Sequence, residues 1–222
     1  MASPSSCAPW SCSKVGPDRV WGTERSGGQT SLSGTPADTW PFLGPSLKSV
    51  AILLYLTRKY KTPDHWYPQD LQARARVDEY LAWQHTALRR NCLRTLWHKL
   101  MLPVFMGEPV APEMLAATLA ELDGSLQLLE DKFLQNKAFF AGPHISLADL
   151  VAITELMHAV GAGCQVFEGR PKLAAWRQRV EAAVGAVLFQ EAHEVILKVK
   201  DSPPADPTIK QKLRPSILAL IQ

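Results

Sequence analysis

Cysteine is scarce in this sequence, its net charge is small, and it has no long apolar run. Four cysteines in 222 residues are too few and too scattered for a disulfide scaffold, so we expect a reducing compartment, the cytoplasm. No uninterrupted apolar stretch reaches the roughly 18 residues of a membrane-spanning helix, which excludes a membrane span, and we expect no membrane partner. The 24 basic and 21 acidic side chains nearly balance, and this excludes the dense basic surface of a nucleic-acid-binding protein.

Residues 1–48 differ in composition from the rest of the chain. They contain nine Ser, six Pro and six Gly, and their apolar residues follow neither the helical nor the strand period. Such a segment buries too little apolar surface to offset the entropy that it would lose on folding. We therefore predict a disordered, Ser/Pro/Gly-rich leader over 1–48.

From Ser49 onward the pattern is helical, and no segment alternates as a strand would. This predicts an all-α bundle of about seven helices. The expected helices cover 49–60, 70–101, 115–133, 146–160, 171–184, 186–199 and 208–221. Pro103 and the segment 107–112 are expected to end the second helix. The third helix repeats leucines at steps of four and three, so it needs a long partner, most simply the preceding helix running antiparallel to it.

Two further helices begin at recognisable signals. Ser146 can cap the helix that follows it, and Asp149, three residues on, can accept hydrogen bonds from the free N–H groups at that end. Pro171 suits the first position of the next helix, where its missing N–H costs nothing.

Four segments together resemble the theta class of cytosolic glutathione S-transferases, and within it the type 1 members. They are SVAILLYL at 49–56, the run from Tyr-Pro-Gln-Asp to Trp at 67–83, SLADL at 146–150 and FEGRP at 167–171. The resemblance is continuous over 49–222. It implies that 49–61 is the last helix of the family's thioredoxin-like domain and that 62–222 is its C-terminal helical domain.

The resemblance also implies an activity, the conjugation of glutathione to small electrophiles such as halomethanes and epoxides. Glutathione would be a co-substrate, and no other cofactor is expected. Ser49 matches the serine that holds the γ-glutamyl end of glutathione. The segment that approaches the glutathione site, from the partner subunit in a dimer, is matched by Thr86, Ala87, Leu88 and Arg89.

Arg89 and Trp97 match family positions near the electrophile pocket. They lie eight residues apart on one expected helix, so both can face the same cleft. Without the resemblance, Ser49 is equally well a helix cap, Arg89 a solvated side chain and Trp97 a core residue. The last helix resembles the lid over that pocket, although Ser216 stands where a tryptophan is expected.

Part of the family's machinery is not recognisable in this sequence. Residues 1–48 show neither a strand–serine–helix unit that would activate the thiol nor a Val-Pro-x-Leu turn, and Lys48 replaces the acid expected before Ser49. We therefore assign no catalytic residue and expect weak or absent activity. The alternative is a non-catalytic helical module that forms a homodimer or pairs with an intact family member.

The remaining polar residues give weaker indications of a functional site. His144 and His158 lack carboxylate or thiol partners at ligand spacing, so no metal site is expected.

The helix 49–60 is apolar around most of its circumference. Without a sheet packed against it, several of its side chains would face water, which predicts dimerisation, capture of a partner or poor solubility.

Overall fold

The computed structural model describes residues 49–221, and every regular element in that range is helical. This confirms the predicted all-α bundle, whereas the predicted leader lies outside the described residues. In chain order the elements are α1 (Ser49–Lys59), η2 (Asp64–Trp66), α2 (Leu71–Thr86), α3 (Leu88–Leu96), η3 (Trp97–Met106), α4 (Pro112–Leu128), η4 (Leu129–Leu134), α5 (Leu147–Gly161), α6 (Pro171–Val184), α7 (Ala186–Lys198), η5 (Val199–Asp201) and α8 (Pro207–Ile221). None of the described helices combines the length and the apolar character needed to cross a bilayer.

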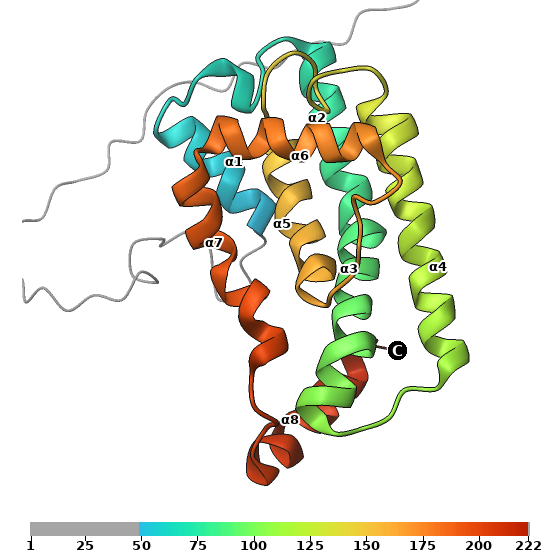
Figure 1. Cartoon of the computed structure of the whole chain (residues 1–222). Helices are drawn as coiled ribbons and strands as arrows, with labels where there is room; N and C mark the ends of the chain where they lie inside the picture. The colour runs from blue at the N-terminus through green and yellow to red at the C-terminus, as the bar shows by residue number, and fades with distance from the viewer. Residues whose placement is uncertain (1–48, 222) are drawn as a thin grey trace, which may run out of the picture. The chain divides into compact units, whose positions relative to one another are not determined.

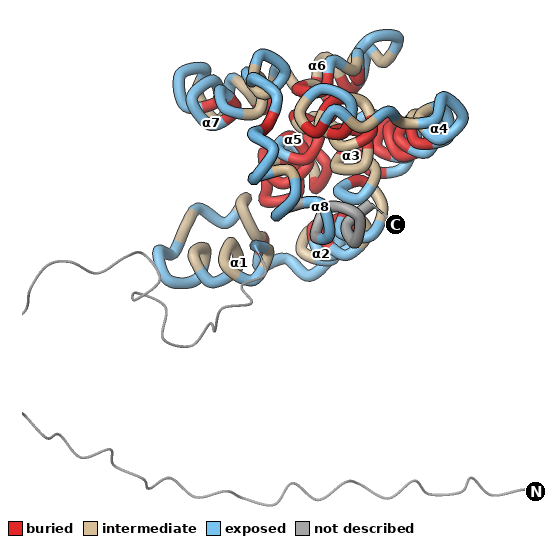
Figure 2. The backbone as a smooth tube through the Cα atoms, turned by 90° about the horizontal axis from the view of Figure 1, so that it is seen from below, coloured by how far each residue is buried: buried red, intermediate tan, exposed pale blue. Residues whose placement is uncertain are grey.

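Helix α5 is the centre of the bundle. Eleven of its 15 residues are buried, because it packs against α3 on one side and α7 on another (Figure 1). Helix α1 is the opposite case: it belongs to the same compact unit but has no buried residue, and Figure 2 shows it without the buried positions that fill α3, α4 and α5. Its apolar side chains are half-buried, and Tyr55 is 40% exposed.

The expected helix over 70–101 is broken, and this part of the prediction is wrong. Ala87 leaves helical geometry at φ −112° and ψ −82°, which separates α2 from α3. From Trp97 the backbone widens into the π-helical segment η3, which passes through Pro103 and ends at Met106. A wider turn relieves the clash between a proline ring and the carbonyl group one turn back. Gly107 then ends the helix with a left-handed φ of 70°.

The predicted antiparallel pairing of the third helix is confirmed. Helix α4 runs back along α3 (Figure 1), and polar contacts fix the register between them. Asn91 Nδ2 donates to Ser125 Oγ over 2.9 Å, and Arg94 pairs with Glu121 at 2.6 Å. The leucine seam of α4 becomes buried from its middle onward. The expected capping box of α5 and the expected start of α6 at Pro171 are also present.

One residue of the connection after η4 holds a costly backbone conformation. Gln135 has φ 54° and ψ −118°, a region that favours glycine. We expect Gln135→Gly to raise the free energy of unfolding by about 1 kcal/mol, since the strain is removed. Urea denaturation measures this. Asn136→Gly is the matched control, because Asn136 is also exposed but has an ordinary φ. A loss of stability in Gln135→Gly as large as in the control would contradict the assignment of strain.

Candidate functional site

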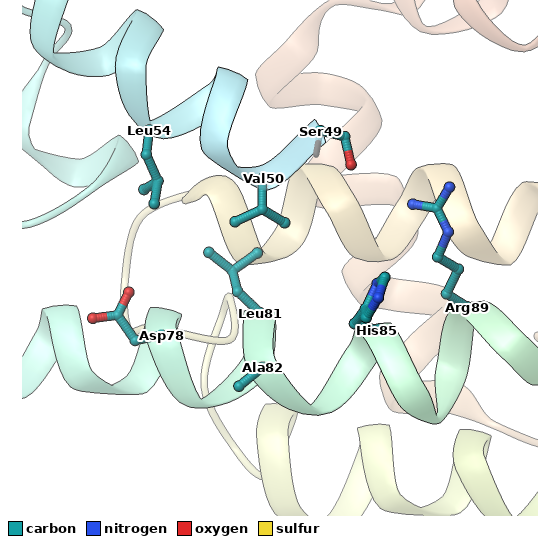
Figure 3. Close-up of a pocket in the computed structure, with 8 residues that line it drawn as sticks. All are labelled: Ser49, Val50, Leu54, Asp78, Leu81, Ala82, His85 and Arg89. Carbon is teal, nitrogen blue, oxygen red and sulfur yellow. The ribbon is translucent and has the colours of Figure 1, made fainter. Parts of the chain in front are cut away.

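A pocket of about 680 Å³ lies between α1 and the pair formed by α2 and α3. Its size is within the range of small-molecule sites. Its walls come from Ser49, Val50, Leu54, Asp78, Leu81, Ala82, His85 and Arg89. Figure 3 shows α1 on one side of this space and the pair formed by α2 and α3 on the other.

Helix α1 supplies one wall of the pocket. Val50 and Leu54 lie one turn apart on the same face of α1 and pack against the core. Ser49 is the first residue of the helix and is exposed at its end. The free N–H groups at this end and the helix dipole favour an anionic group.

A stripe along α2 and the start of α3 supplies the opposite wall. Asp78, Ala82, His85 and Arg89 follow one another at steps of four, three and four, so they share one face despite the bend at Ala87. Asp78 lies at one end of the pocket (Figure 3). Its Oδ1 accepts a hydrogen bond of 2.9 Å from the Tyr67 hydroxyl. Burial, and then this bond to Asp78, raises the pKa of Tyr67.

The other end of the pocket carries positive charge. Arg89 Nη1 lies 3.4 Å from Glu155 Oε1, with the arginine side chain 44% exposed and the glutamate side chain 8% exposed. His158 Nδ1 lies 3.9 Å from the second carboxylate oxygen of Glu155. Burial raises the pKa of the Glu155 carboxyl, and the charges of Arg89, His158 and His85 oppose that rise. The pocket therefore has an acidic end at Asp78, an apolar middle and a basic end at His85 and Arg89.

The structure brings together two of the site residues predicted from the sequence. Ser49 and Arg89 line the same pocket, from the first turns of α1 and α3. Thr86 is exposed, and its hydroxyl donates to the Trp83 carbonyl at 3.4 Å. Ala87 occupies the bend. The role of these residues toward glutathione stays a prediction.

Leu88 and Trp97 lie elsewhere in the fold. Leu88 is fully buried in the main core, so only its backbone could reach a ligand. Trp97 begins η3 and packs against the small cluster around Leu102 and Met106. At 3.6 residues per turn, eight residues leave Trp97 rotated by about 80° from Arg89 around the helix axis. The pocket that Arg89 lines does not include this tryptophan.

Sequence reasoning missed three charged or titratable groups of this region. Asp78 and His85 continue the helical stripe of Arg89 toward the N-terminus, so the spacing was a usable signal. Glu155 is a buried carboxylate in the middle of the largely apolar α5, and such a residue normally has a specific partner. Over residues 49–221, no group of three His, Cys, Asp or Glu side chains could hold a metal ion.

Comparisons with known proteins agree with this architecture. The family model described as "Glutathione S-transferase, C-terminal domain" matches residues 93–183. Human glutathione S-transferase theta-1 is 85% identical over 175 residues, which cover 79% of this chain and 73% of the human protein. The chicken theta-1 enzyme is 52% identical over 174 residues, or 78% and 67% of the two chains.

Solved structures of theta-class glutathione transferases also superpose on this chain. The apo form of human glutathione S-transferase T1-1 superposes with a TM-score of 0.78 at 84% identity, covering 79% of this chain and 74% of that one. Human glutathione transferase theta-2, in complex with glutathione and an unknown ligand, superposes with a TM-score of 0.72 at 46% identity, covering 79% and 72%.

Proposed function

Because this chain belongs to the theta class of glutathione S-transferases, we propose that it binds glutathione and transfers it to small electrophiles such as halomethanes and epoxides. The observation that carries this proposal is the pocket in which Ser49, at the start of α1, and Arg89, from α3, share one space. The helix end beside Ser49 suits a carboxylate of glutathione. Arg89 offers a planar cation to a second carboxylate or to an anionic group on the electrophile.

The reaction is a nucleophilic displacement. The sulfur of the glutathione thiolate forms a bond to carbon, and the bond from that carbon to the halogen or to the epoxide oxygen breaks with its electron pair. A free thiol is only a few per cent thiolate at neutral pH, so the rate depends on a donor that stabilises the anion. The pocket residues described here bind and orient the reactants, and holding both in one geometry is itself a large part of catalysis.

We further propose that turnover in this chain is slow. The sequence of 1–48 shows no recognisable strand–serine–helix unit to activate the thiol, and Lys48 replaces the acid expected beside the γ-glutamyl ammonium group. The second candidate is a non-catalytic helical module. The half-buried apolar side chains of α1 favour it, because they suit pairing with a second copy or with an intact theta-class subunit in the cytoplasm.

Incubation of the full chain with glutathione and dichloromethane tests the proposal, with chloride release as the measurement. We expect release above the uncatalysed rate, and we expect Arg89→Ala to lower kcat/KM about tenfold. Arg90→Ala is the matched control, since Arg90 is exposed and lies outside the pocket. Release at the uncatalysed rate in the wild type would favour the non-catalytic module. Equal losses in the two arginine variants would contradict the assigned pocket.

A further inference from the structure

We propose that Glu155 is a positioning residue that holds the Arg89 guanidinium at the basic end of the pocket. The inference rests on the proposed function, in which Arg89 meets glutathione or the anionic part of an electrophile. It adds a residue from the centre of the bundle to a pocket that is otherwise built from α1, α2 and α3.

The geometry joins a fixed carboxylate to an adjustable cation. Glu155 lies on α5, the most buried helix, and its own side chain is 8% exposed. Arg89 is 44% exposed, and its Nη1 reaches Glu155 Oε1 at 3.4 Å. An arginine without such a partner would distribute its guanidinium over many rotamers and would lose that freedom on binding a ligand. Glu155 removes part of this entropy before the ligand arrives.

Three basic side chains interact with the Glu155 carboxylate, and two of them line the pocket. Arg89 of α3, His158 one turn further along α5 and His85 of α2 all interact electrostatically with the carboxylate. Arg89 and His85 also line the pocket. A single buried carboxylate therefore lies behind the basic end, and it pairs with the cation whose side chain is left partly exposed to a ligand.

The neighbouring arginines show that this pairing is specific to Arg89. Arg90 is exposed and forms no ion pair with the carboxylates of the described residues. Arg94 pairs with Glu121 at 2.6 Å, but that glutamate is 47% exposed and neither residue lines the pocket. Among the ion pairs of residues 49–221, only the one formed by Arg89 and Glu155 combines a buried acid with a cation in the pocket wall.

Steady-state kinetics of the full chain test the kinetic part of the inference. In Glu155→Gln, which keeps the size and removes the charge, we expect KM for glutathione to rise about tenfold while kcat changes less than about twofold. Glu155→Asp keeps the charge but retracts it, and a smaller rise is expected. Glu121→Gln removes a comparable ion pair outside the pocket and should leave KM unchanged. A purely structural role for Glu155 would lower the melting temperature in Glu155→Gln without this change in KM, and that result would overturn the proposal.

A second measurement does not depend on activity. In the protein labelled with ¹⁵N-arginine, we expect slow rotation of the Arg89 guanidinium, assigned by its loss in Arg89→Lys, and fast rotation in Glu155→Gln and Glu155→Asp. Unchanged rotation in both Glu155 variants would overturn the proposal. If rotation responds to Glu155 but Arg89→Ala leaves glutathione binding and turnover intact, the proposed role of Arg89 fails while the positioning by Glu155 stands.

Discussion

Replacing Asp149 by alanine is expected to lower the free energy of unfolding by about 4 kcal/mol, because three segments donate hydrogen bonds to this one carboxylate. The backbone N–H groups of Phe140 and Ser146 donate at 2.9 and 3.0 Å, the Ser146 hydroxyl at 2.8 Å and the Trp176 indole at 2.8 Å. Asp149 is fully buried, and burial raises its pKa against the effect of these four bonds. Alanine would leave buried donors without an acceptor, and each such group costs about 1–3 kcal/mol.

Two milder variants check this expectation in the same urea titration. Asp149→Asn keeps one acceptor oxygen and should lose less stability than alanine. Ser146→Ala removes the capping hydroxyl but leaves the carboxylate with its other donors, so a loss of about 1 kcal/mol is expected. A loss in Asp149→Ala no larger than that of Ser146→Ala would mean that the carboxylate does not join α5, α6 and the segment before them.

Adding a methyl group at Gly161 is expected to destabilise the protein by about 3 kcal/mol. A Cβ at this position would lie 2.5 Å from the carbonyl oxygen of Ile196, an atom of the α7 backbone. Backbone cannot rotate away as a side chain can, so α5 and α7 would have to separate. Thermal and urea denaturation of Gly161→Ala measure the cost.

Gly124→Ala is the matched control on another helix. Gly124 lies inside α4, is exposed, and has no atom within 4 Å of the added Cβ. Alanine there should raise stability by about 1 kcal/mol through its better helix propensity. If Gly161→Ala is as stable as the wild type, or gains stability as Gly124→Ala should, the close approach of α5 and α7 at Gly161 is not as described.

Patterns that depend on neighbouring residues could be predicted from the sequence. The leucine steps of α4 indicated its buried face, and Ser146 with Asp149 indicated the start of α5, since capping and periodicity are local properties. The break at Ala87 could not be predicted in the same way, because alanine is a good helix former. Pro103 does signal an interruption of this helix, but local sequence does not tell whether a proline ends a helix or lies within a widened turn, as it does in η3.

The same division applies to the candidate site. The family resemblance pointed to Ser49 and Arg89, and the pocket contains both. Glu155 was missed because it lies 66 positions after Arg89, and only the packing of α3 on α5 brings the two together. Spacing alone misplaces Trp97, because eight residues are about 80° more than two full helical turns and this tryptophan packs against the cluster around Leu102 and Met106.

Calorimetric titration of glutathione into the full chain tests the central claim most directly, because that claim concerns what the space between α1 and the α2–α3 pair accommodates. The account predicts saturable binding that weakens about tenfold in Arg89→Ala and remains unchanged in Arg90→Ala. Absence of saturable heat in the wild type, or equal affinity in all three proteins, would contradict it.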